Sequence, residues 1–445
     1  MSNLQRAIKI KFTNKKVGIL GLGIENYALI KFLLTHKIKC KITICDLKSE
    51  EELKKNYKYL VNKKNISWKL GKDEIKRLDG FDVIYRSPGW PVFDPAIHEA
   101  VKLGVKLSSA INLFFRLCPS TNIIGVTGSK GKGTTASLIY EIIKTSGKRV
   151  WLGGNIGIAP FEFIDKIKKN DWVVLELSSF QLEDIRFSPK IAVITNFFPE
   201  HLASADPSNP NYHRSSKEYW AAKTNILKLQ KSRDKAIINI KLKSRNLKYG
   251  DCKKVFFKKS QLKSKLVGEH NKENIAAAVM AAKGAGISNR IIEKAVGKFD
   301  GLEHRLEPVR TIDNVKYFND SFATTPEAAA TALKSFKEPI ILLLGGAEKN
   351  SNFRQLARLI KKKVKDMILL NGDSSPRIKK ELLKIKYPPK NIHPADNIAK
   401  GVNKARQVSV PGDIVILSPA CASFGMFKNY KERGRLFKEA VRKLK

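Results

Sequence analysis

Short apolar runs recur along the chain, and most end in glycine or polar residues before a helical pattern begins. The run Lys16–Leu20 leads into Gly21-Leu-Gly23, and residues 27–34 then show helical spacing. Apolar runs without alternation are typical of parallel strands buried on both faces, with helices between them. The runs that predict strands are 16–20, 41–45, 82–85, 123–126, 171–177, 191–196, 317–318, 340–344, 367–370 and 414–417.

The segment Asn122–Thr135 carries the strongest chemical signal, because an apolar strand runs into a glycine-rich turn and then a helix. The turn lets backbone N–H groups converge on phosphate oxygens through Gly128, Gly131 and Gly133. Lys132 is placed to reach the β- and γ-phosphates, and Thr134 or Thr135 to hold Mg²⁺. The P-loop match is imperfect, since Val126 replaces the first glycine and Gly133 the usual hydroxyl. A chance glycine-rich turn is the alternative, but the flanking strand and helix favour a nucleotide site.

The predicted elements group into three blocks, so the pattern predicts three α/β domains in tandem. A chain of 445 residues is too long for one ordinary hydrophobic core. Cys118-Pro119 is a natural linker after the first block. We predict a Rossmann-like domain over residues 1–118, a central P-loop ATPase domain over 119–301, and a second Rossmann-like domain over 302–445.

Charged side chains follow two central strands at the points where those strands end. Glu176 lies at the end of 171–177, and Glu200-His201 follows 191–196. A buried carboxylate without a partner is costly, so a cation near Glu176 is the economical explanation. A lone loop histidine is more often structural than a metal ligand, but the position of His201 favours a ligand.

The first glycine turn resembles half of a Rossmann unit, because the following strand ends in the acidic Asp46. Asn26 stands where the third glycine of that fingerprint belongs, so the motif is weak and a plain βα turn is the alternative. A further predicted strand, 82–85, leads into the turn Ser87-Pro-Gly89.

The formal net charge of +43 raises the question of a nucleic-acid partner. The lysines are spread over the whole chain, without an aromatic-interleaved basic stripe, so we expect a solvated surface that favours small anionic substrates. No run is long enough to cross a membrane, and the N-terminus has no apolar leader. Five scattered cysteines suit reduced thiols. We therefore expect a cytoplasmic monomer without nucleic-acid or membrane partners.

Longer strings resemble the Mur ligases, the ATP-dependent amino-acid-adding enzymes of peptidoglycan synthesis. The most specific strings are Glu176–Glu183 and Leu417–Ser423. Further shared segments follow in the same order through the blocks: Gly154–Gly157, Ala221–Lys223, Gly268–Asn274, His304-Arg305, Asn319–Ser321 and Leu343–Gly346. The resemblance is greatest to members that join D-glutamate to UDP-N-acetylmuramoyl-L-alanine.

The resemblance implies that ATP phosphorylates a carboxylate to an acyl phosphate, which an amine then attacks. It assigns ATP to Gly128, Ser129, Lys130, Gly131, Lys132, Gly133, Thr134, Thr135, Asn274, Arg305 and Asp320. It assigns catalysis to Lys132, Glu176, His201 and Lys223. It assigns one Mg²⁺ to Thr134 or Thr135 with Glu176, a second Mg²⁺ site to His201, and a further metal-ligand role to Lys223 as a carbamate. It assigns the UDP-linked substrate to Gly23, Ile24, Glu25, Asp46, Ser87 and Asn155, with Asn155 at its muramoyl or pyrophosphate region. It assigns the incoming amino acid to Thr324, Lys349, Ser423, Phe424 and Tyr430.

The chain departs from that family pattern in the third block. The D-glutamate-adding members carry a lysine where this chain has Phe322, and a phenyl ring cannot pair with the glutamate carboxylate. The Gly133 turn is similar to that of folylpolyglutamate synthases. A related ligase with another amino acid is therefore one alternative. A basic nucleic-acid-binding NTPase and a non-catalytic scaffold are alternatives of other classes, and without the resemblance Lys223 is an ordinary exposed lysine.

Overall fold

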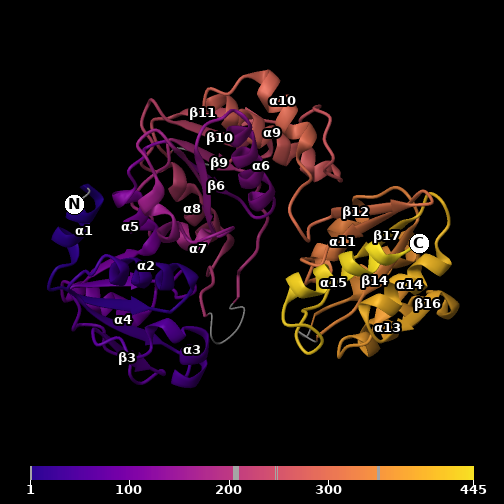
Figure 1. Cartoon of the computed structure of the whole chain (residues 1–445), viewed down its shortest axis with the longest axis horizontal. Helices are drawn as coiled ribbons and strands as arrows, with labels where there is room; N and C mark the ends of the chain where they lie inside the picture. The colour runs from indigo at the N-terminus through magenta and orange to yellow at the C-terminus, as the bar shows by residue number, and fades with distance from the viewer. Residues whose placement is uncertain (1–2, 204–209, 246, 248, 348–350) are drawn as a thin grey trace. The chain divides into compact units, whose positions relative to one another are not determined.

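The computed structural model describes residues 3–203, 210–245, 247, 249–347 and 351–445 (Figure 1). The chain divides into two compact units. The N-terminal unit comprises Met1–Gln261 and Glu273–Val296, and the C-terminal unit comprises Leu262–Lys272 and Gly297–Lys445. The described residues form three mainly parallel sheets with helices between their strands, which confirms the predicted α/β class. None of the described helices combines the length and apolar character that a bilayer span requires.

The first sheet of the N-terminal unit is parallel throughout, in the order β3-β2-β1-β4-β5. Its strands are β1 (Lys16–Leu20), β2 (Lys41–Asp46), β3 (Ile66–Leu70), β4 (Val83–Arg86) and β5 (Lys106–Ser109). The helices around it are α1 (Asn3–Phe12), α2 (Ile24–Thr35), α3 (Glu50–Asn56), α4 (Pro95–Lys102) and α5 (Ala110–Leu117). Side chains of α1, α2 and α5 join one hydrophobic cluster and those of α4 another, so the sheet is covered on both faces.

The second sheet of this unit is also parallel, in the order β11-β10-β9-β6-β8-β7. Its strands are β6 (Ile123–Thr127), β7 (Val150–Gly154), β8 (Trp172–Glu176), β9 (Ile191–Ile194), β10 (Lys235–Asn239) and β11 (Lys253–Phe257). The helices that accompany it are α6 (Lys132–Thr145), α7 (Ser179–Leu182), α8 (Ser216–Thr224), α9 (Glu269–Gly284) and α10 (Asn289–Lys298). Single 3₁₀ turns in the N-terminal unit are η1 (Lys58–Leu60), η2 (Pro160–Glu162), η3 (Ile164–Lys166), η4 (Asn225–Leu227) and η5 (Ile240–Leu242).

One continuous hydrophobic core joins these two sheets. The ring of Phe161, in the turn η2, packs against Phe32 of α2 at 5.0 Å and against Phe114 of α5 at 6.3 Å between ring centroids. The same cluster includes Ile19 of β1 and Val173 of β8, both fully buried. The first two predicted domains therefore share one core, although each has its own sheet.

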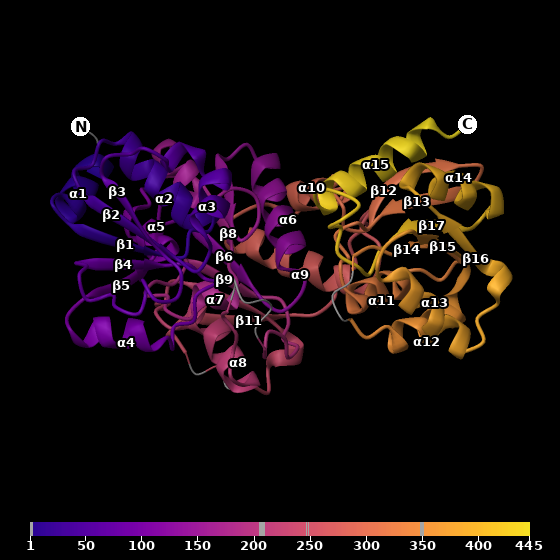
Figure 2. The same cartoon turned by 90° about the horizontal axis from the view of Figure 1, so that it is seen from below.

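The C-terminal unit has a six-stranded sheet in the order β12-β13-β17-β14-β15-β16. Its strands are β12 (Glu307–Ile312), β13 (Val315–Asn319), β14 (Ile340–Leu344), β15 (Val364–Leu370), β16 (Ile392–Ala395) and β17 (Ile414–Leu417). Its helices are α11 (Pro326–Lys334), α12 (Arg354–Lys363), α13 (Ser375–Lys384), α14 (Ile398–Val408) and α15 (Tyr430–Lys443), with the turn η6 (Pro389–Asn391). Figure 2 shows α11, α12 and α13 on one face of this sheet and α14 and α15 on the other.

Strand β12 runs antiparallel to β13, which differs from the wholly parallel sheet that the apolar runs predict. The turn between them consists of Asp313 and Asn314, whose φ angles are 45° and 59°. Two central residues with positive φ make the hairpin turn that matches the twist of antiparallel strands, and Asp and Asn tolerate it. The short polar turn therefore adds an antiparallel edge strand to a parallel sheet.

A buried arginine also ties the first two sheets together. Arg86, at the end of β4, is 1% exposed and lies 3.1 Å from the carboxylate of Asp184 and 3.3 Å from that of Glu183. Its guanidinium also donates to the backbone carbonyls of Trp90 and Phe180. A buried cation with several acceptors holds the loop after α7 against the end of β4.

We expect Arg86→Met to lower the free energy of unfolding of the N-terminal unit by about 3–5 kcal/mol at pH 8. The methionine keeps most of the volume, but it leaves the carboxylates of Glu183 and Asp184 buried without their cation. Urea unfolding followed by circular dichroism measures the change. Arg77→Met is the matched control, because Arg77 is 86% exposed and pairs loosely with Asp79, so a change under about 0.5 kcal/mol is expected. Equal effects of both substitutions would contradict a stabilising role for Arg86.

Candidate functional site

The predicted phosphate loop joins the buried strand β6 to helix α6. Gly128 and Gly131 have φ angles of 146° and 79°, which other residues rarely adopt. A Cβ atom at Gly128 would collide with Thr195, and one at Gly131 would collide with Asn274 of α9. Both turn glycines are therefore required by close packing, and Asn274 lies beside the loop, as its predicted role in ATP binding requires.

The ammonium of Lys132, the first residue of α6, donates to the backbone carbonyls of Gly128 at 3.0 Å and Ser129 at 2.9 Å. The side chain therefore folds back over the loop that it follows. The hydroxyl of Ser129 donates to the carbonyl of Phe198, and the backbone N–H of Lys130 donates to Asn196. Contacts with the segment after β9 thus fix the loop from its other side.

A cavity of about 250 Å³ opens beside the phosphate loop. Its lining comes from segments far apart in the sequence: Pro88, Gly89, Lys132, Asn155, Ser178, Ser179, Phe180, His201, Tyr219 and Lys223. Three of the four predicted catalytic residues, Lys132, His201 and Lys223, line this one cavity. The fourth, Glu176, is connected to it because Asn155 donates its side-chain amide to the Glu176 carboxylate at 2.8 Å.

Lys223 is buried, not the exposed lysine that its local sequence alone indicates. Its side chain on α8 is 1% exposed, donates to the carbonyl of Gly128 at 2.8 Å, and lies 4.3 Å from the centre of the Tyr219 ring. Burial, together with the charge of Lys132, lowers the pKa of Lys223 well below its usual value. The environment thus favours the neutral amine, which is the form that reacts with CO₂.

The donors around this cavity suit Mg²⁺, which prefers oxygen ligands. Glu176 is 5% exposed at the end of β8 and brings one carboxylate to the buried edge of the sheet. The hydroxyl of Thr135 is buried and has no hydrogen-bond partner among the described residues, whereas Thr134 is half-buried. Burial lowers the pKa of His201, so its imidazole is available as a neutral ligand. These residues fit the two predicted Mg²⁺ sites, and both threonines remain candidates.

The residues predicted for UDP lie mostly at the carboxyl ends of the first sheet. A Cβ at Gly23 would lie 3.4 Å from the hydroxyl of Ser87, so the turns after β1 and β4 are adjacent. Asp46 accepts hydrogen bonds from the backbone N–H groups of Leu22 and Lys48, which fixes the first turn. Ile24 is 71% exposed at the start of α2. Asn155, predicted for the muramoyl or pyrophosphate region, lies beside the phosphate loop in the cavity that Pro88 and Gly89 also line.

Glu25, another residue predicted for the UDP-linked substrate, is bonded within the protein. Its carboxylate accepts a hydrogen bond from the amide of Gln181, in α7 of the other sheet. Burial raises the pKa of Glu25 to about 7. The Glu25 carboxyl group thus helps to join the two sheets. Its role in binding UDP stays a prediction.

In the C-terminal unit, several predicted residues gather where β13 and β17 end. Asp320 accepts from the hydroxyl of Ser418 at 2.8 Å and from the backbone of Leu306 at 3.1 Å. The guanidinium of Arg305 lies 3.8 Å from the centre of the Phe322 ring, and Phe322 packs edge-on against Tyr430 at 5.0 Å. Phe322 therefore stacks on a residue predicted to bind ATP.

The other predicted amino-acid ligands are placed less closely together. Thr324 follows the Phe322 turn and is half-buried, and Ser423 is 5% exposed. Phe424 is 61% exposed. Lys349 lies outside the described residues.

The pH dependence of stability tests the buried position of Asp320. Desolvation raises the pKa of Asp320 to about 7. The folded chain therefore keeps a proton that the unfolded chain has lost between roughly pH 4 and pH 7, so stability falls as pH rises through this range. We expect Asp320→Asn, which cannot ionise, to stabilise the C-terminal unit at pH 8 by on the order of 4 kcal/mol and to have little effect at pH 4. Thermal unfolding at both pH values measures this difference, with Asp373→Asn, an exposed aspartate of the same unit, as control. A gain of equal size at both pH values would contradict the prediction.

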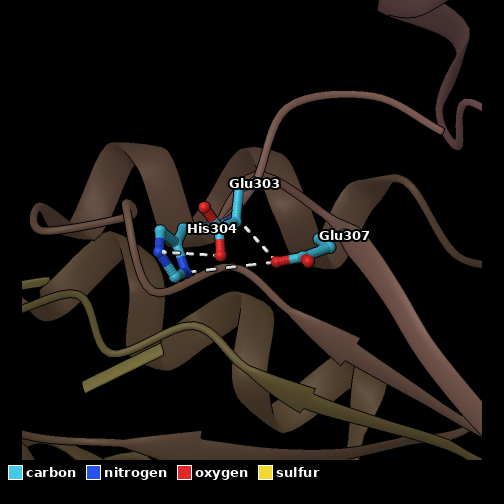
Figure 3. A group of neighbouring side chains, drawn as sticks. All are labelled: Glu303, His304 and Glu307. Carbon is cyan, nitrogen blue, oxygen red and sulfur yellow. Dashed lines mark hydrogen bonds and ion pairs between the residues drawn. The ribbon is translucent and has the colours of Figure 1, made fainter. Parts of the chain in front are cut away.

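A cluster of two glutamates and a histidine lies beside Arg305. Figure 3 shows its members, Glu303, His304 and Glu307, turned toward one another. His304 lies 3.7 Å from Glu303 and 4.0 Å from Glu307. The ammonium of Lys438 bonds both carboxylates, at 3.0 Å to Glu307. Because a lysine already supplies the positive charge, this group acts as an ion-pair network that fixes the turn carrying Arg305.

The sequence did not predict the cavity residues whose side chains have no group for acid, base or metal chemistry, such as Phe180. Phe180 stacks on His213 at 4.8 Å and contacts His201 edge-on at 5.3 Å, so it positions the loop that carries His201. The turn before Phe180 is a capping box, in which Ser178 and Gln181 exchange hydrogen bonds. The Ser-x-x-Gln spacing was a readable signal for that helix start, whereas the ring contacts depend on the tertiary structure.

The sheets, the phosphate loop and the cavity beside it define an α/β enzyme of the P-loop nucleotide-binding class. Three family domains match in order: the Mur ligase MurD-like N-terminal domain at residues 15–109, the Mur ligase middle domain at 126–257, and the Mur ligase glutamate ligase domain at 304–421. The chain belongs to the Mur ligase family and is thus an ATP-dependent, amide-bond-forming ligase.

Similar proteins match along nearly their whole length. The UDP-N-acetylmuramoylalanine–D-glutamate ligase of Clostridium tetani is 38% identical, over 97% of this chain and 97% of its own. The enzyme of the same name from Ruminiclostridium cellulolyticum is 36% identical, over 100% of both. Among solved structures, MurF ligase from Thermotoga maritima in complex with ADP has a TM-score of 0.58 at 16% identity, covering 100% of both chains. The MurC ligase of Thermotoga maritima has a TM-score of 0.56 at 19% identity, over 96% of this chain and 99% of its own. These last two show the shared fold.

Proposed function

We propose that this ligase joins D-glutamate to UDP-N-acetylmuramoyl-L-alanine, using ATP and Mg²⁺, in the synthesis of cytoplasmic peptidoglycan precursors. The observation that carries the proposal is the cavity that unites Lys132, His201 and Lys223 beside the phosphate loop. The names of relatives at 36–38% identity along nearly the whole chain support the substrate assignment. The chain would act as a monomer, with small-molecule partners and neither nucleic acid nor membrane.

The residues of the cavity suit the chemistry of acyl-phosphate formation. Lys132 neutralises charge on the phosphoryl group in transfer, where positioning and electrostatics supply most of the catalysis. Glu176, His201, Thr134 or Thr135, and a carbamate on Lys223 would hold Mg²⁺, which supplies further charge neutralisation. Phosphate then leaves when the amine attacks the acyl carbon, so the carboxylate oxygen that attacked ATP departs with it.

The remaining assignments keep their predicted roles in this proposal. The turns around Gly23, Asp46 and Ser87 would bind UDP at the carboxyl ends of the first sheet. Arg305 and Asp320 would serve ATP, and Tyr430 would contact the amino acid together with Thr324, Lys349, Ser423 and Phe424. Phe322 is already stacked on Arg305, so it would order that arginine, and another group would have to pair with the side-chain carboxylate of the amino acid.

Phosphate release from ATP and Mg²⁺ tests this function. UDP-N-acetylmuramoyl-L-alanine is supplied with D-glutamate, L-glutamate, L-lysine or diaminopimelate in separate reactions. Release that requires both the UDP-sugar and D-glutamate supports the full proposal. Release with another amino acid would keep the ligase and overturn the specificity, and release stimulated by nucleic acid alone would overturn both.

A further inference from the structure

A second cavity lies in the N-terminal unit, at the edge of the first sheet opposite to the predicted UDP site. Its volume is about 490 Å³. Its walls come from α1, α5, the residues where β4 and β5 begin, and the loop Arg186-Phe187 after α7. Ser87 lies past the other end of β4, and a strand of this length separates the two edges by roughly 13 Å. The cavity is therefore distinct from the site built around the phosphate loop.

Four cationic side chains face this cavity without a counter-ion. Lys11, Lys106, Arg116 and Arg186 line it, and none of their charged groups forms an ion pair among the residues that the structure describes. Of the two acidic residues in the lining, Asp82 pairs at 2.9 Å with Lys15, a fifth cation of the lining, and Asp79 pairs at 3.4 Å with Arg77, which lies outside it. The cavity thus has a surplus of positive charge.

The cations are close enough to affect one another. Burial lowers the pKa of Lys11, and the charges of Arg116 and Lys106 lower it further. Like charges held together cost free energy, and an anion placed between them offsets that cost. The arrangement favours a ligand with at least one negative charge.

The rest of the lining is apolar. Leu107 and Phe187 are half-buried in the wall, so part of their apolar surface faces the cavity, and Phe187 stacks on Phe115 with ring planes 1° apart. A simple inorganic anion would leave these surfaces against water, whereas a ligand with a ring or an alkyl group would cover them. Cationic and apolar walls together fit a molecule with both kinds of group.

We propose that this cavity binds a small organic anion, which joins a phosphate or carboxylate group to an aromatic or apolar group. The negative group lies among Lys11, Lys106, Arg116 and Arg186. The apolar part lies against Leu107 and Phe187. The site is separate from substrate and ATP binding, so it suits an effector of the enzyme.

Phenyl phosphate is the probe, and isothermal titration calorimetry on the full chain measures its binding. We expect saturable binding to the unmodified protein, and weaker binding of both phenol and inorganic phosphate. Lys11→Gln combined with Arg116→Gln should raise the Kd about tenfold or more, because charged hydrogen bonds are lost. The single substitution Arg186→Gln, at an exposed side chain, should also raise the Kd.

Two controls separate this cavity from other cationic sites. Lys9→Gln removes an exposed cation from the same helix α1, outside the cavity, and should leave the Kd unchanged. Lys132→Ala alters the phosphate loop and should also leave it unchanged. The proposal is overturned if the unmodified protein shows no saturable binding, if Lys9→Gln weakens binding as much as the double variant, or if Lys132→Ala abolishes it. These readouts do not depend on ligase activity, so they stand apart from the test of the proposed function.

Discussion

Lys132→Ala should lower kcat for phosphate release by about a thousandfold or more, without unfolding the protein. Lys132 is the cation at the start of α6, and its ammonium already lies on the carbonyls of the phosphate loop. Removing a charge that stabilises the phosphoryl group in transfer typically costs this much, because positioning and electrostatics supply most of the catalysis. Steady-state phosphate release with the UDP-sugar and amino acid measures the loss.

The matched control is Lys144→Ala, which removes a lysine from the last turn of the same helix. Its ammonium lies over the ring of Tyr140 on the helix surface, 5.6 Å from the ring centre, so kcat should stay within about twofold. Thermal unfolding of both variants shows whether the fold is kept. Near-normal turnover in Lys132→Ala would remove the phosphate-loop assignment, and an equal loss in both variants would point to a general effect of charge.

The apolar pattern predicted most of the strands that are buried on both faces, because burial favours uninterrupted apolar residues, but it missed the buried interior strand β10. The runs 340–344 and 414–417 coincide with β14 and β17, whose residues are buried throughout. Edge strands such as β3, β5 and β16 were not predicted, since partial exposure admits polar residues and breaks the run. The direction of β12 depends on the two-residue turn at Asp313, a local signal that the apolar pattern does not contain.

The residues of the candidate site likewise divide into those that the sequence could predict and those that it could not. Glycine turns and charged residues at strand ends are local features, so the phosphate loop and Glu176 could be found from sequence. The burial of Lys223 depends on α8 packing against the loop that contains Gly128, far away in sequence. Likewise, the sequence shows only that Phe322 replaces the lysine of the D-glutamate-adding ligases. The fold is needed to show that its ring packs against Arg305. Long-range packing therefore sets the chemistry of residues whose identity alone is ambiguous.

Lys223→Ala should also lower kcat by about a thousandfold, and for a different reason. Burial and the charge of Lys132 lower the pKa of Lys223, which favours the neutral amine, and this amine can add to CO₂ and release a proton to give a carbamate. The carbamate would carry a negative charge and so serve as a counter-ion to the cations of the cavity. It would also offer oxygen ligands to Mg²⁺. Alanine removes the attachment point, so added bicarbonate should not restore activity, whereas acetate, a free carboxylate small enough for the space, should restore part of it.

The control for this variant is Lys217→Ala, on the exposed side of the same helix α8, which should keep normal turnover. A second readout needs no turnover at all. Protein equilibrated with ¹³C-labelled bicarbonate should show one carbamate carbon signal by NMR, and Lys223→Ala should lose that signal while Lys217→Ala keeps it. Normal activity in Lys223→Ala, or a carbamate signal that survives the substitution, would contradict the role assigned to Lys223. Loss of activity with no signal in the unmodified protein would instead leave an unmodified amine as the acting group, since its burial against Gly128 and Tyr219 does not require the modification.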